Sequence, residues 1–220
     1  MTAPAIIVAV DGAAGSGKST LARGLARALG VAYVNTGSMY RALAAASIRA
    51  EVDATDADAL VDLVRGLRFT LTGEEAPELE VEGYATAELT TPEVESRVSV
   101  VARHPAVRTL MRDLQRTLGA GGVVMEGRDI ATVVFPDAPL KVFLRASEDE
   151  RSDRRARERG SADRATVRDA IRERDARDAR TNRLEPGPGA MVIDTSDLSI
   201  DATLETVLEH ARRIWPEGTS

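Results

Sequence analysis

Cysteine is absent from this chain of 220 residues, and histidine occurs only at His104 and His210. Disulfide bonds and thiolate metal sites are therefore excluded, and a zinc site built on histidines is not expected. Aromatic residues make up only 3% of the sequence, whereas hydrophobic residues make up 43%. The core must consist mainly of Ala, Val, Leu and Ile, which is typical of a parallel β-sheet covered by helices.

Long apolar runs and a basic N-terminal segment are also missing. Met1 to Pro4 lead directly into the first apolar stretch, and no run approaches the roughly 20 residues that span a membrane. We expect a cytoplasmic protein that does not associate with a membrane. The length suits a single domain with a full core, to which a small lobe can be added.

An excess of positive charge is lacking as well, because the formal net charge at pH 7 is -6. General nucleic-acid binders usually need a basic surface, so no nucleic-acid partner is expected. The basic residues are concentrated in residues 151–183, which hold 12 Arg against 7 Asp or Glu. Lysine occurs only at Lys18 and Lys141, and a GC-rich coding bias is a simple explanation for the excess of arginine.

The most informative stretch runs from Gly12 to Ser19 and matches the phosphate-loop pattern G-x-x-x-x-G-K-[ST]. Residues 6–10 before it are apolar and β-branched, which predicts a strand. Leu21, Leu25 and Leu29 after it have helical spacing, which predicts a helix. A glycine-rich turn between a strand and a helix N-terminus presents backbone N–H groups to an anion, and this one fits a triphosphate.

Each residue type in this loop suits ATP. Lys18 would neutralise the β- and γ-phosphates, the hydroxyl of Ser19 would bind Mg2+, and Thr20 would continue the first helical turn. The predicted ATP-binding residues are Gly12, Ala13, Ala14, Gly15, Ser16, Gly17, Lys18, Ser19 and Thr20.

Four further short apolar segments predict strands, at 32–34, 123–125, 140–144 and 191–193. Helical patterns separate them, with expected caps at Thr91, Ser147 and Ser199 among others. Alternating strands and helices after a phosphate loop predict an α/β fold, a five-stranded parallel sheet of the P-loop kinase type. The guanine-reading motifs of GTPases are not found, and motor or AAA-type ATPases are usually longer.

Two segments depart from this alternation. Residues 68–72 and 78–82 alternate between polar and apolar side chains, which predicts a β-hairpin within a small inserted substrate lobe at about 68–90. Residues 148–183 are charged and helical in character with an interruption at Gly160, and we expect them to form a lid.

Chemically active residues follow the second and third predicted strands. Residues 36–41 follow the second strand, and Glu126, Gly127, Arg128 and Asp129 follow the third. Open parallel sheets bind ligands at the carboxyl ends of their strands, so both segments should meet the phosphate loop. Glu126 is expected to hold Mg2+ together with Ser19.

These stretches together resemble the bacterial cytidylate (CMP) kinases, within the nucleoside monophosphate kinase family, over nearly the whole chain. Residues 12–20 resemble the ATP loop of that family, and residues 36–41 resemble its monophosphate loop. Ser99 and Arg108, with Pro105 between them, match the pair that reads the cytosine ring there. Residues 126–139 resemble its most distinctive segment.

The resemblance implies ATP-dependent phosphorylation of CMP and dCMP, with Mg2+ as cofactor and an expected monomeric state. Phosphoryl transfer is catalysed mainly by positioning and charge stabilisation, which suits arginine. Lys18, Arg128 and Arg174 are the implied catalytic residues, and Arg154, Arg155 and Arg157 lie in the expected lid. The implied substrate-binding residues are Thr36, Gly37, Arg41, Ser99, Arg108, Arg128, Asp129, Arg174, Asp178 and Arg180.

The sequence departs from that family at two positions. Asn35 stands where the family usually has an aspartate, and Thr181 stands where it has the last arginine of R-x-x-x-D-x-x-R. Arg180 and Arg183 are the available substitutes for that arginine. Asp129 and Asp178 are expected to orient arginines and to bind base or ribose, because a phosphate monoester needs no general base near neutral pH.

Two alternatives remain open from sequence. One is a neighbouring P-loop kinase acting on UMP, AMP or a non-nucleotide acceptor such as shikimate. The other is a nucleotide-dependent binding module, such as a ribosome-associated protein, that has borrowed the fold. Intact Lys18, Ser19 and Glu126 favour an active kinase.

Overall fold

The computed structural model describes residues 5–159, 164–181 and 184–216. Its strands form one sheet in the order β3-β4-β2-β5-β1-β6-β7. The strands, in chain order, are β1 (Ile7–Gly12), β2 (Ala32–Asn35), β3 (Phe69–Thr72), β4 (Glu78–Val81), β5 (Val123–Gly127), β6 (Leu140–Arg145) and β7 (Met191–Asp194). The five strands predicted from sequence are all present, and they lie parallel to one another.

The prediction of five strands is wrong in number, because the sheet has seven. The hairpin of β3 and β4 extends the sheet beyond β2. Tyr33 N donates a hydrogen bond of 2.8 Å to the carbonyl oxygen of Pro77, and Tyr33 pairs with Glu78. The edge of β2 would otherwise expose unpaired backbone groups, and the hairpin satisfies them.

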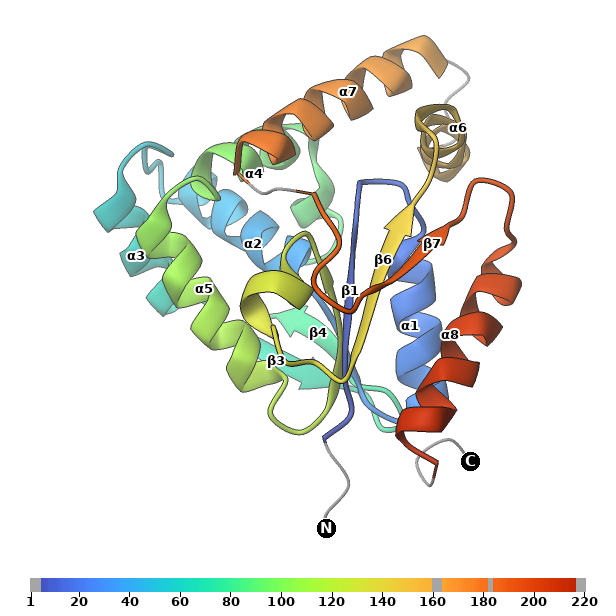
Figure 1. Ribbon diagram of the computed structural model, residues 1–220. Coiled ribbons are helices and arrows are strands. Elements are labelled where there is room, and N and C mark those ends of the chain that lie inside the picture. The colour runs from blue at the N-terminus through green and yellow to red at the C-terminus, as the bar shows by residue number, and fades with distance from the viewer. Residues whose placement is uncertain (1–4, 160–163, 182–183, 217–220) are drawn as a thin grey trace.

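Helices cover both faces of the sheet (Figure 1). On one face lie α1 (Lys18–Leu29) and α8 (Ile200–Ile214), and on the other α2, α3 and α5. The remaining elements are α2 (Thr36–Arg49), α3 (Ala57–Gly66), η1 (Glu88–Thr90), α4 (Pro92–Val101), α5 (Pro105–Leu118), the π-helical turn η2 (Ile130–Val134), α6 (Glu148–Arg159) and α7 (Arg164–Thr181). Figure 1 shows α7 above the edge where β1 and β6 end, away from both termini.

Short polar side chains begin several helices as the sequence predicts. The side-chain oxygens of Thr91, Ser147 and Ser199 each accept a hydrogen bond from a backbone N–H in the first turn. Helix α2 starts at Thr36, directly after β2, and the Asn35 side chain caps it by accepting a bond from Ser38 N. The monophosphate-loop residues therefore lie in the first turns of a helix.

The core has two halves, one on each face of the sheet. Val8 and Val10 pack under α1 and α8, whereas Ala9 between them packs on the opposite face. This alternation is the period of two that a β-strand imposes. A third, small cluster of Ala156, Val167 and Ile171 joins α6 to α7.

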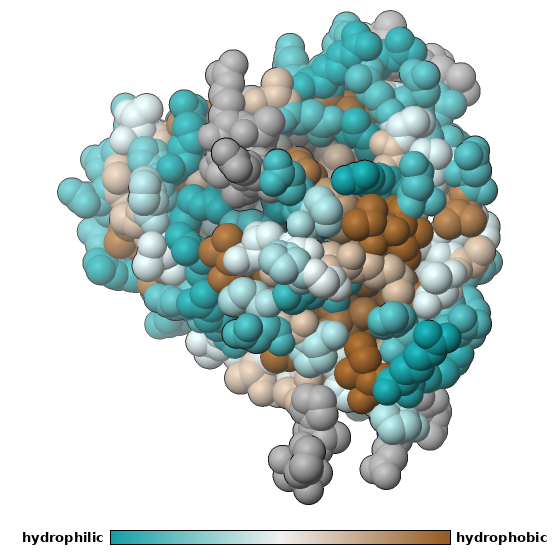
Figure 2. All heavy atoms as spheres, viewed as in Figure 1, coloured by the Kyte–Doolittle hydropathy of each residue, from teal (hydrophilic) through white to brown (hydrophobic). Residues whose placement is uncertain are grey.

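The surface view agrees with this arrangement. Figure 2 shows hydrophilic residues over the outer face of α7, and hydrophobic ones near the β7 edge, where Val192 is 45% exposed. Within the described part of the chain, no helix has the length and apolar character needed to cross a membrane.

Leu25→Ala should lower the free energy of unfolding by about 2–5 kcal/mol, because it removes a fully buried side chain from the core beneath α1. Arg27→Ala on the exposed side of the same helix should change it by less than about 0.5 kcal/mol. Urea unfolding of both variants measures the difference, and equal losses would contradict the packing of α1.

Candidate active site

The phosphate loop has the backbone conformation predicted for it. Gly12, Gly15 and Gly17 adopt φ values of 148°, 77° and 91°, in the region that favours glycine. A Cβ at Gly12 would overlap with the carbonyl oxygen of Leu144 on β6. The Nζ of Lys18 donates a 2.5 Å hydrogen bond to Ala13 O, so the lysine folds back over the loop.

A cavity of about 450 Å³ opens beside this loop, between the carboxyl ends of the strands and helices α4, α5 and α7. It brings together residues from four stretches that the sequence analysis singled out: the phosphate loop, residues 36–41, the pair Ser99 and Arg108, and residues 126–129. The predicted site residues that line it are Ala14, Gly15, Lys18, Ser19, Thr36, Gly37, Arg41, Ser99, Arg108, Glu126, Arg128 and Asp129.

The other predicted residues lie outside this lining or cannot be described. Four residues belong to the phosphate loop but do not line the cavity: Gly12, Ala13, Ser16 and Gly17. Thr20 is exposed and lies in the first turn of α1. Backbone atoms of three predicted residues lie in α7, but their side chains are outside the described part of the structure: Arg174, Asp178 and Arg180.

One wall of the cavity is built around an ion pair. Arg108 Nη2 on α5 donates to Asp129 Oδ2 at 2.5 Å, and both side chains are mostly buried. Ser99 on α4 and Tyr40 on α2 line the same space. Burial raises the pKa of Tyr40 to about 12, while Arg108 acts in the opposite direction. This wall can donate and accept hydrogen bonds toward a flat polar ligand.

Arg41 on α2 lines the same cavity. Its Nη2 donates to Ser38 Oγ at 2.9 Å. Its Nε is buried and has no hydrogen-bond partner among the described residues. Burial lowers the pKa of Arg41, and the Glu95 and Glu126 carboxylates partly offset this effect. A guanidinium with a buried donor to spare suits an anionic ligand.

Glu126 is the penultimate residue of β5 and lines the cavity. Tyr33 Oη donates a 2.5 Å hydrogen bond to Glu126 Oε1, and Thr36 Oγ1 donates to its backbone oxygen at 2.8 Å. Burial and the Glu126 carboxylate raise the pKa of Tyr33, so the phenol stays a donor. Glu126 and Ser19 line the same cavity and offer the oxygen ligands that Mg2+ prefers.

That donor set suits Mg2+ bound together with a nucleotide. Among the described residues there is no group of three or more His, Cys, Asp or Glu that could hold a metal by itself. Mg2+ usually keeps several waters and takes one or two protein ligands beside substrate phosphates. A hydroxyl and a carboxylate on two walls of one cavity therefore fit this ion.

Asp11 is a residue that the sequence reasoning missed. It is the penultimate residue of β1, is 2% exposed, and accepts hydrogen bonds from Ile130 N at 2.9 Å and Ala131 N at 2.7 Å. The carboxylate thus connects the strand before the phosphate loop to the turn after Arg128 and Asp129. An acidic residue at the end of a buried strand is the sequence signal that could have found it.

A second contact missed from sequence joins the expected lid to the acceptor side. Arg155 Nη2 on α6 donates to Glu95 Oε1 on α4 at 3.0 Å, and both residues line the cavity. The three lid arginines differ, since Arg154 bonds to Thr195 and the side chain of Arg157 is 71% exposed. Only the tertiary structure distinguishes them.

A strand, a phosphate loop and a helix beside an arginine-rich cavity define a class of protein, the P-loop kinases of small acceptors. The chain belongs to the cytidylate kinase family, whose family model matches residues 8–213. It is 41% identical to a cytidylate kinase of Streptomyces avermitilis, with 94% of this chain and 93% of that protein covered.

Further relatives agree with this family. A cytidylate kinase of Roseiflexus castenholzii is 43% identical and one of Mycobacterium avium is 41% identical. The first alignment covers 94% of both chains, and the second covers 94% of this chain and 93% of the relative. The resemblance deduced from motifs is confirmed, and neither the other acceptor classes nor the binding module is favoured.

The pH dependence of stability tests the environment of Asp11. Burial raises its pKa from 3.8 to about 6, against the two backbone N–H groups and Lys18, which lower it. Between these values the folded state holds a proton that the unfolded state has lost. The contribution of Asp11 to the free energy of unfolding should therefore fall by about 2 kcal/mol from pH 4.5 to pH 7.

Asp11→Asn removes this titration. Between pH 4.5 and pH 7, the wild type should therefore lose about 2 kcal/mol of unfolding free energy relative to Asp11→Asn. Urea unfolding of both proteins at both pH values measures this loss. The same difference at both pH values would show that the carboxyl is not protonated in the folded state.

Proposed function

We propose that this protein transfers the γ-phosphoryl group of ATP to CMP, giving ADP and CDP, and that dCMP is a second acceptor. The observation that carries the proposal is the single cavity in which Lys18 of the phosphate loop and the Arg108–Asp129 ion pair face the same space. Direct transfer of a phosphoryl group between two nucleotides requires that one cavity binds both, with a phosphate loop for ATP and a wall that recognises the base of the acceptor.

The donor triphosphate lies in the phosphate loop. Gly15, Lys18 and Ser19 line the cavity beside it, and helix α1 starts at Lys18, so the positive end of the helix dipole lies at this loop. Lys18 is 5% exposed, so its positive charge acts in a site largely shielded from water. The lysine stabilises the charge that moves during transfer.

The acceptor phosphate is held by Arg41 and Arg128. Both line the cavity, from α2 and from the turn after β5. The buried Nε of Arg41 supports this role, since a phosphate oxygen would give it a partner. Two guanidinium groups can hold the acceptor in line with the γ-phosphate of ATP.

The cytosine ring is read by Ser99, Arg108 and Asp129. Cytosine has an exocyclic amine that donates and a ring nitrogen that accepts, whereas uracil reverses both. A guanidinium held by a carboxylate donates in a fixed direction toward the ring nitrogen and carbonyl. A hydroxyl or carboxylate accepts from the amine, so uracil would leave buried groups unpaired.

Mg2+ is proposed as the cofactor, held by Ser19 and Glu126 beside the ATP phosphates. When bound there, it would neutralise part of the charge on the phosphates. The hydrogen bond from Tyr33 fixes one oxygen of the Glu126 carboxylate, which limits its rotation.

Residues 148–183 are proposed to act as the lid, and residues of about 68–90 as a substrate lobe. Arg155 reaches the cavity from α6, and the ion pair with Glu95 supports a lid that closes toward α4. Arg174, Asp178 and Arg180 on α7 are proposed to contact the substrates from this side. Closure would exclude water and limit hydrolysis of ATP. A monomeric state, a cytoplasmic location and the lack of a nucleic-acid partner stay predictions.

Lys18→Met should reduce kcat by about a hundredfold or more, because it removes a charge that stabilises the transition state. The chain offers a matched control, since its other lysine, Lys141, bonds to Pro188 O at an exposed position. Lys141→Met should keep wild-type activity. A coupled assay of ADP release with CMP, dCMP, UMP, AMP and shikimate measures both variants. Wild type that prefers AMP or shikimate would overturn the proposed function.

Ser99→Ala should narrow the ratio of kcat/KM for CMP over UMP by about tenfold, because a hydroxyl that accepts from the amine is lost. Thr109 on α5 donates its hydroxyl to Pro105 O at an exposed position and does not line the cavity, so Thr109→Ala serves as the control. Unchanged discrimination in Ser99→Ala, or an equal effect in Thr109→Ala, would contradict this mode of base reading while leaving the proposed reaction standing.

A further inference from the structure

Three carbonyl groups of the phosphate loop are held by side chains. Lys18 Nζ donates to Ala13 O, Arg151 Nη1 on α6 donates to Ala14 O at 3.2 Å, and Thr195 Oγ1 after β7 lies 3.1 Å from Ser16 O. In a trans peptide the C=O and the following N–H point in opposite directions. A fixed carbonyl therefore fixes the direction of the next N–H group.

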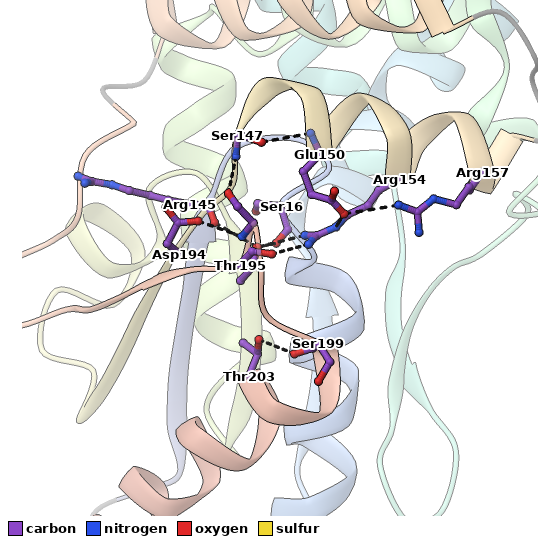
Figure 3. A network of polar contacts seen from close by, with 11 residues as sticks. Ser16, Arg145, Ser147, Glu150, Arg154, Arg157, Asp194, Thr195, Ser199 and Thr203 are labelled. Atoms are coloured by element: carbon purple, nitrogen blue, oxygen red, sulfur yellow. Dashed lines mark hydrogen bonds and ion pairs between the residues drawn. The ribbon is translucent and has the colours of Figure 1, made fainter.

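Thr195 acts on the peptide between Ser16 and Gly17. It is 4% exposed, and its Oγ1 lies within 3.1 Å of Ser16 O, Arg145 O and Arg154 Nη1 (Figure 3). Gly17 has a φ of 91° and precedes the first residue of α1. With Ser16 O directed at Thr195, the N–H of Gly17 points away from Thr195.

The single hydroxyl proton of Thr195 has two acceptors within reach, Ser16 O and Arg145 O, each 3.1 Å from Oγ1. Arg154 Nη1 can only donate, so it occupies a lone pair of the hydroxyl oxygen. Arg145 O already accepts a 2.8 Å bond from Thr195 N. Because Arg145 O already has this partner, the hydroxyl proton goes to Ser16 O, and Thr195 donates to the phosphate loop.

Arg154 holds this threonine from the expected lid. Its Nη2 donates to Thr195 O at 2.5 Å, and its Nε donates to Glu150 Oε1 at 2.9 Å. Figure 3 shows the guanidinium of Arg154 between Glu150 of α6 and Thr195. The first helix of the expected lid and the phosphate loop thus share one buried contact point.

We propose that Thr195 is a positioning residue for the donor nucleotide. Its hydroxyl fixes the Ser16–Gly17 peptide so that the N–H of Gly17 is presented to the phosphates of ATP, and Arg154 keeps the hydroxyl in the donating orientation. This inference rests on the proposed function, because it assumes that the loop binds ATP. Thr195 acts through the loop and contacts no substrate itself.

Thr203 provides a matched comparison within the same view. It is also buried, at 1% exposure, and its Oγ1 donates a 2.9 Å bond to Ser199 O within α8. Both hydroxyls bond to a backbone carbonyl, but only Thr195 bonds to the phosphate loop. Loss of either hydroxyl should lower the free energy of unfolding, whereas only loss of the Thr195 hydroxyl should weaken the binding of ATP.

The test compares Thr195→Val, Thr195→Ser and Thr203→Val with the wild type. The Kd for ATP with Mg2+ is measured by calorimetry without an acceptor, and KM values for ATP and CMP are measured in the kinase assay. Valine keeps the shape of threonine without its hydroxyl, so Thr195→Val should weaken ATP binding by about three- to tenfold, the value of one hydrogen bond. Its KM for CMP should change less than twofold.

The other two variants show whether the hydroxyl is the cause. Thr195→Ser should bind ATP as the wild type does, because it restores the donor, and Thr203→Val should leave the Kd for ATP unchanged. Thr195→Val with wild-type affinity, equal rises in both KM values, or no rescue by serine would overturn the inference. Wild type that does not bind ATP would instead overturn the proposed function, so the two failures are distinguishable.

Discussion

Parallel pairing of β1 with both β5 and β6 is the constraint on which the site depends. In this register Asp11 lies opposite Gly127, and Gly12 lies opposite Leu144. Parallel strands end at the same edge of a sheet, so the phosphate loop emerges beside the segment that carries Arg128. The approach to β6 is so close that no side chain fits at Gly12. The central position of β1 thus brings the proposed donor and acceptor sides together.

Hydrogen bonds and ion pairs between elements distant in the sequence then fix the positions of the side chains at the ends of these strands. The Asp11 carboxylate connects β1 to the turn after Asp129, and Asp129 in turn holds Arg108. These charges are mostly buried, so each needs its partner to offset the cost of desolvation. Exposed pairs such as Arg65 with Asp62 contribute little by comparison. The buried pairs therefore fix the orientation of the hydrogen-bond donors that line the site.

The arginine-rich segment illustrates why composition alone could not assign roles. Arg151 bonds to the phosphate loop and to Asp175, Arg154 bonds to Thr195, and Arg155 pairs with Glu95. Their neighbour in the sequence at 157 is largely exposed. Residues on one helix differ in this way because each faces a different part of the molecule, and a count of charges does not contain that information.

The sequence by itself determined the local features and the family. The phosphate loop, the five parallel strands and caps such as Thr91 and Ser199 depend on residues a few positions apart, so short patterns specify them. Only the tertiary structure decided that the predicted hairpin joins the main sheet, because an edge strand can find its partner anywhere in the chain. It also decided the roles of Asp11 and Thr195, whose partners lie 119 and 179 positions away. Such contacts arise from strand order and packing, which no local pattern encodes.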